Sequence, residues 1–150
     1  MIDLRTAPYA ALVLRLTIGT ALIAHSLFLK VFVFTMPGTV RFFESIGLPG
    51  ALAWATLLAE AIAGVMLVLG VRSREAALLA LPFLLGATWA HSGSGWLFTS
   101  PNGGWEYPLF WSLALAAQAL LGDGAFALSP SRPLPAGSAR SGRMSASATA

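Results

Sequence analysis

Three side chains in this sequence are candidates for proton exchange: Glu60, His91 and Glu106. Glu60 lies inside a long apolar stretch, where an isolated carboxylate is costly and usually functional. His91 titrates near neutral pH and can donate or accept a proton, and Glu106 stands where the last apolar stretch begins. We therefore predict that any catalytic chemistry of this chain is carried by these three residues.

A connection rich in glycine and tryptophan follows His91, at residues 92–105. Flexible glycines beside large aromatic side chains are typical of a lid over a planar apolar ligand such as a quinone. The same residues would suit an aromatic belt at a membrane surface, with Glu106 complementing a helix dipole, and both interpretations stay open at this point. The residues predicted to contact such a ligand are His25, Lys30, Trp96, Trp105 and Tyr107.

The two histidines, His25 and His91, invite comparison with the axial ligands of a haem. Histidines in a small helical protein more often form hydrogen bonds near an interface or line a cavity as protonatable groups. The chain has no cysteine, which excludes disulfides, thiolate metal sites and iron–sulfur clusters held by its own cysteines. We predict no metal site and no intrinsic cofactor, and a quinone is the candidate ligand if the connection is a lid.

Three further positions are predicted to be structural. Arg15 lies inside the first apolar stretch and could reach Glu60 to form a buried pair. Alternatively, Arg15 extends toward lipid headgroups and Glu60 forms a hydrogen bond between helices. Gly64 adjoins a stripe of alanines that allows another helix to approach closely, and Asp123 lies in the Gly-Asp-Gly segment that ends the last apolar stretch.

The elements that must position these residues are membrane helices. Of the 150 residues, 57% are hydrophobic and 10% are charged, against about 25% charged residues in soluble domains. We expect an all-α fold, an integral membrane four-helix bundle over residues 1–128, followed by a Ser-, Pro- and Arg-rich tail at 129–150 that is expected to be disordered. The predicted spans are residues 8–34, 51–71, 75–91 and 107–121.

The first span competes with a second interpretation, a cleaved signal peptide, because Arg5 precedes an apolar stretch. An arginine inside that stretch and the lack of a clear cleavage site favour a retained helix.

Charge predicts the orientation of the bundle. Basic residues concentrate on the segments that share a side with the N-terminus, so both termini are expected in the cytoplasm. The net charge is +3, yet the basic residues are scattered between apolar stretches and form no face for phosphates. We therefore expect a lipid bilayer as partner and no nucleic acid. The predicted cytoplasmic residues are Arg5, Arg72, Arg74, Arg132, Arg140 and Arg143, against Lys30 and Arg41 outside.

These motifs, in their order, resemble the DoxX family of small four-helix membrane proteins over about residues 10–128. The matching pieces are Leu14-Arg15-Leu16 with Gly19, then His25 and Lys30, Phe42 to Pro49, Ala59-Glu60 with Gly64, Leu69-Gly70, His91 with Gly93, Gly95 and Trp96, Gly103-Gly104, Glu106-Tyr107-Pro108, and Gly122-Asp123-Gly124.

The resemblance implies a multi-pass protein of the bacterial inner (plasma) membrane that is associated with redox systems. The family is named for a membrane subunit of an archaeal thiosulfate:quinone oxidoreductase, and other members look like partners of oxidative-stress proteins. We expect a membrane component of an oxidoreductase system that interacts with the quinone pool. The alternative is a non-enzymatic scaffold that docks a redox or oxidative-stress enzyme, which the lack of haem, flavin and nucleotide motifs favours. A small-solute transporter has only Glu60 to support it.

Overall fold

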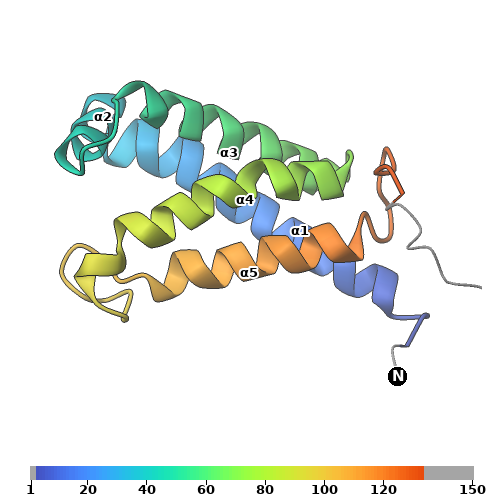
Figure 1. Cartoon of the computed structure of the whole chain (residues 1–150). Helices are drawn as coiled ribbons and strands as arrows, with labels where there is room; N and C mark the ends of the chain where they lie inside the picture. Colours follow the sequence, from blue (N-terminus) through green and yellow to red (C-terminus); the bar gives the residue numbers. More distant parts are fainter. Residues whose placement is uncertain (1–2, 134–150) are drawn as a thin grey trace, which may run out of the picture.

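The structure is a computed structural model that describes residues 3–133, and within that range it is helical, with one isolated bridge between Val71 and Ser129 and no strand (Figure 1). The predicted all-α class is confirmed. The five α-helices are α1 (Ala7–Ile23), α2 (Met36–Ser45), α3 (Ala51–Leu69), α4 (Ser73–Ala90) and α5 (Glu106–Leu121). Helix α1 continues directly into a π-helical segment, η1 (Ala24–Val33), and α4 is followed by a short 3₁₀ turn, η2 (Ser92–Ser94).

Three helical segments are long and apolar enough to cross a membrane: Ala7–Val33, Ala51–Leu69 and Ser73–Ser94. They correspond to the first three predicted spans. Helix α5 has 16 residues, or about 24 Å of helix, which is shorter than a hydrocarbon core of about 30 Å. A fourth crossing by α5 therefore stays a prediction.

Helix α2 was not predicted from the sequence. Pro37 lies in its first turn, and the hydroxyl of Thr35 accepts a hydrogen bond from the Gly38 amide at 3.3 Å, which caps the helix. Met36 packs with Ala53 and Leu57 of α3 in a small separate core. The segment is too short and too polar to show as an apolar stretch, so only its packing on α3 reveals it.

The main core lies where α1, α3, α4 and α5 meet, and small residues dominate it. Ala76, Ala77 and Ala80 of α4 are fully buried, which lets the neighbouring helices approach closely. Leucines fill the remaining space, and many large apolar side chains face outward, as expected for helices that contact lipid. The buried leucines of this main core are Leu22, Leu67, Leu84 and Leu115.

The bundle has two distinct ends, which Figure 1 shows on opposite sides. We call residues 34–50 and 91–105 the loop end, and residues 3–8, 70–73 and 122–133 the terminal end. At the terminal end the chain after α5 returns to the α3–α4 turn: Ser129 donates its amide to Gly70 and accepts one from Arg72. The Arg132 amide binds the Glu75 carboxylate, so the hydrogen-bonded chain continues four residues beyond the expected boundary at Leu128. Residues 134–150 of the expected tail lie outside the described part.

Candidate functional site

Lys30 and Glu60 form an ion pair between η1 and α3. The Lys30 side chain is 15% exposed and the Glu60 side chain is 7% exposed. An ion pair shielded in this way satisfies both charges inside a membrane helix bundle. Glu60 was predicted to be catalytic and Lys30 to contact a ligand; the structure joins the two side chains, and both roles stay predictions.

Arg15 is buried, with 1% of its surface exposed, and does not contact Glu60. Its guanidinium donates to the carbonyls of Leu67 and Val68 at 3.0 and 3.2 Å and to the Ala125 carbonyl at 2.8 Å. The predicted Arg15–Glu60 pair is therefore wrong, and the burial of Arg15 contradicts its extension to the headgroups. The other half of that alternative, a hydrogen bond between Glu60 and another helix, is present as its bond with Lys30. The last carbonyls of a helix have no partner within it. Arg15 supplies a partner to the Val68 carbonyl and a second one to the Leu67 carbonyl, which also accepts from the Gly70 amide.

His25 lies at the start of η1 and faces α5. Its ring is 4.8 Å from that of Trp111, edge-on at 68°, and 6.3 Å from that of Tyr107, with ring distances measured between centroids. Tyr107 and Trp111 are themselves 5.0 Å apart. We call His25, Tyr107 and Trp111 the aromatic cluster, and it brings together two of the predicted ligand-contacting residues.

His91 lies at the loop end and has other neighbours. Its ring stacks on Phe42 of α2 at 6.1 Å, and its Nδ1 is 3.0 Å from the Asn102 carbonyl oxygen. It does not stack on His25, whose ring packs against Trp111 and Tyr107 of α5. Nor does any group of three or more histidine and acidic side chains suited to a metal ion occur among residues 3–133.

Residues of the glycine- and tryptophan-rich connection contact one another and the start of α5. Trp96 and Trp105 pack edge to face at 4.4 Å, and the Glu106 carboxylate accepts the Phe98 amide at 2.9 Å. The two indoles contact each other, while Trp96 stays 51% exposed, and Glu106 holds the loop. Gly95 has a φ of +88°, a conformation that glycine adopts without strain. A cavity of about 370 Å³ lies beside this loop, lined by Trp96, Glu106, Tyr107, Leu109, Phe110 and Leu113.

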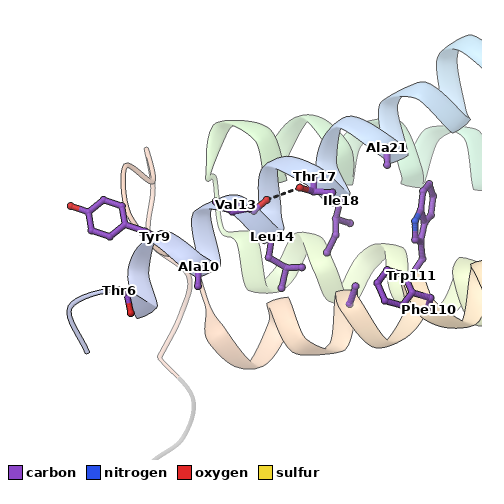
Figure 2. Close-up of a pocket in the computed structure, with 11 residues that line it drawn as sticks. Thr6, Tyr9, Ala10, Val13, Leu14, Thr17, Ile18, Ala21, Phe110 and Trp111 are labelled. Atoms are coloured by element: carbon purple, nitrogen blue, oxygen red, sulfur yellow. Dashed lines mark hydrogen bonds between the residues drawn. The ribbon is translucent and has the colours of Figure 1, made fainter. Parts of the chain in front are cut away.

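A larger groove of about 700 Å³ runs between α1 and α5 (Figure 2). The hydroxyl of Thr17, which lies in it, already donates to the Val13 carbonyl at 2.9 Å. Most of the lining is apolar, and Trp111 links the groove to the aromatic cluster. The residues that line it are Thr6, Tyr9, Ala10, Val13, Leu14, Thr17, Ile18, Ala21, Phe110, Trp111 and Ala114. No sequence signal pointed to this groove, because it depends on the angle between two helices.

Asp123 organises the terminal end. Its carboxylate accepts the Ser73 amide at 2.9 Å and both the amide and the hydroxyl of Ser131 at 2.7 Å. It thereby caps α4 from a distant part of the chain. Burial opposes ionisation of Asp123, but the hydrogen bonds from Ser131 and Ser73 outweigh it and lower its pKa.

The fold and the buried charges define a helical membrane protein. A model of the DoxX family matches residues 10–93, which is more than half of the chain, and the chain belongs to this family. The match covers α1 to α4 and ends after His91, so the motifs expected beyond Gly93, including Trp96, lie outside it. Comparisons with curated proteins and with solved structures found no match.

Proposed function

We propose that this DoxX-family protein is a membrane component of an oxidoreductase system and that it binds a quinone at the aromatic cluster. The observation that carries the proposal is the position of His25 against Trp111, where the apolar groove reaches the loop end of α1. A quinone combines a planar ring, two carbonyl acceptors and an apolar tail. Trp111 and Tyr107 offer ring contacts, an imidazole N–H offers a donor, and the groove offers an apolar environment.

The proposed quinone site differs from the site that the sequence predicted at the loop after His91. Trp96 and Trp105 pack on each other, while His91 and Glu106 bind loop backbone. His25 and Tyr107 keep their proposed role as ligand contacts. Because the chain has no cysteine, the electrons would come from a partner oxidoreductase, and the protein would supply the quinone site in the membrane.

The proposed setting is the inner membrane of a bacterium, crossed several times, with the terminal end in the cytoplasm. The basic side chains of Arg5, Arg72 and Arg74 support this orientation. Helix α5 would complete a fourth crossing. The aromatic cluster then lies in the outer half of the membrane.

The test is quinone binding by the purified protein in lipid nanodiscs, measured as a Kd for a ubiquinone with a decyl tail. His25→Ala is expected to weaken binding about tenfold, which corresponds to one lost hydrogen bond. His91→Ala is the matched control, since its imidazole contacts Phe42 and Asn102 instead. A loss with His91→Ala and none with His25→Ala would place the ligand at the loop and contradict the proposed site.

A non-enzymatic scaffold is the second candidate, and a specific observation favours it. Glu60, His91 and Glu106, the residues first expected to be catalytic, all have partners within the chain. In this case the protein would bind a redox enzyme through its lipid-facing helices. Ala55, an exposed residue of the small-residue stripe on α3, is the position to change: Ala55→Leu should abolish copurification of the enzyme, while His25→Ala should leave it intact.

A further inference from the structure

We infer that the polyprenyl tail of the quinone occupies most of the length of the α1–α5 groove. The protein therefore selects long-tailed quinones over short-tailed ones. This inference rests on the proposed function, because it takes the ring to lie at the aromatic cluster. It adds the class of tail that the site accepts.

The wall that α1 contributes is one continuous helix face. Ala10, Leu14, Thr17 and Ala21 recur three or four residues apart, and Val13 lies beside Leu14, which is the spacing of side chains on one side of a helix. Because the Thr17 hydroxyl is bound to its own helix, this stretch offers no free hydrogen-bond donor to a ligand. The middle of the groove therefore suits a hydrocarbon chain and not a polar headgroup.

The length of the groove distinguishes between two hydrocarbon chains present in a membrane, a phospholipid acyl chain and a polyprenyl tail. The groove follows α1 from Thr6 to Ala21, which is about 22 Å of helix rise. Even at a helix tilt of about 40°, this is about 17 Å across the membrane. One leaflet of the hydrocarbon core is about 15 Å thick, so a phospholipid acyl chain ends before it fills the groove. A polyprenyl tail is long enough to pass the midplane.

The two ends of the groove have different side chains, and this difference determines which end receives the quinone ring. At the loop end, Trp111 leads to His25 and Tyr107, which supply a donor and ring contacts. At the terminal end, Tyr9 packs edge-on against Phe126 at 6.3 Å, and the groove finishes at Thr6. A quinone whose ring lies at the aromatic cluster therefore has its tail directed toward the terminal end.

The experiment compares two ubiquinones with the same ring, one with a decyl tail and one with its natural polyprenyl tail. Binding is measured in nanodiscs of phosphatidylethanolamine and phosphatidylglycerol, at equal quinone concentration per lipid. Ala10→Trp fills the groove far from His25, and Ala10 is exposed, so the larger side chain fits without unfolding the helix. Val13→Trp is a second groove variant, and Val65→Trp, the same change on an exposed face of α3, is the matched control.

We expect Ala10→Trp and Val13→Trp to weaken binding of the long-tailed quinone about tenfold, because several buried methylene groups lose their contacts. Binding of the decyl quinone should not change with Ala10→Trp, since its short tail does not reach that position. Val65→Trp should change neither.

Three results would overturn the inference. If wild type binds both quinones equally and Ala10→Trp affects neither, the tail lies outside the groove, while the proposed function survives as long as His25→Ala still weakens the decyl quinone. If neither quinone binds, the proposed function fails as well. If phospholipid occupies the groove and neither quinone displaces it, as seen by native mass spectrometry, the occupant is an acyl chain.

Discussion

Lys30 and Glu60 lie 30 positions apart in the chain, and their side chains form an ion pair on the inside of the bundle. The lysine stands in the π-helical segment η1, and the carboxylate stands near the middle of α3. A π-helical turn changes the direction in which the following side chains point compared with an α-helix. The turn thus helps to decide which face of the first span carries Lys30.

The first prediction concerns this pair. Glu60→Gln and Lys30→Met should each lower the free energy of unfolding by about 3–5 kcal/mol, because each leaves one buried charge alone. The double variant Lys30→Met/Glu60→Leu should lose much less, since no charge is left unpaired. Thermal and SDS unfolding in detergent would measure these differences, and Arg41→Met, at an exposed position, is the control. Additive losses in the double variant would contradict the pairing.

The second prediction concerns Arg15. Arg15→Met removes three hydrogen bonds to the carbonyls of Leu67, Val68 and Ala125 and should cost about 2–4 kcal/mol, since these buried or partly buried acceptors lose a charged donor. Hydrogen exchange should quicken at residues 66–70 and 124–128. Arg15→Lys should recover only part of the loss, because an ammonium lacks the planar fork. Full recovery by lysine would mean that charge alone matters, and Arg5→Met, exposed near the N-terminus, should be neutral.

The third prediction compares two helical glycines. A Cβ atom at Gly64 would lie 2.9 Å from the Gly19 carbonyl oxygen and 2.8 Å from the Ile23 side chain, so Gly64→Ala should force α1 and α3 apart at a cost of about 1–3 kcal/mol. Gly86 has open space around it. Gly86→Ala should therefore stabilise the protein by about 0.5–1 kcal/mol through helix propensity. Unfolding curves that ranked the two alanine variants in the opposite order would refute the close contact.

The fourth prediction is a pH dependence. The pKa of Asp123 is lowered in the folded protein, since hydrogen bonds from Ser131 and Ser73 outweigh the effect of burial. A lowered pKa means that the ionised carboxylate favours the folded state at neutral pH. This contribution is fully present above the ordinary aspartate pKa of about 3.9, and it is lost as the pH falls through that value and the lower pKa of the folded state.

Asp123→Asn should therefore lower the Tm at pH 7, and its difference from wild type should shrink as the pH falls toward 3 or so. Asp3→Asn, at an exposed aspartate near the N-terminus, should show no such convergence. A Tm difference that stays constant with pH would show that ionisation of Asp123 does not stabilise the α4 cap.

The candidate site could be predicted only in part. His25 and Tyr107 were expected to contact a ligand, and the structure does place them near each other, at 6.3 Å. His91 and Glu106 were expected to act together, but each binds backbone of the loop. Residue type shows which side chains are able to do chemistry; whether they remain free to do it depends on which neighbours the folded loop supplies.

From the sequence alone, one can determine the helical membrane class, three apolar spans and the position of each ionisable residue along them, because hydrophobicity and helix length are properties of consecutive residues. The tertiary structure decided the rest. It paired Glu60 with Lys30 in place of Arg15, folded residues 36–45 into α2, and opened the groove between α1 and α5. Each of these depends on how the helices are rotated and inclined against one another, and that is set by side-chain packing between segments far apart in the chain.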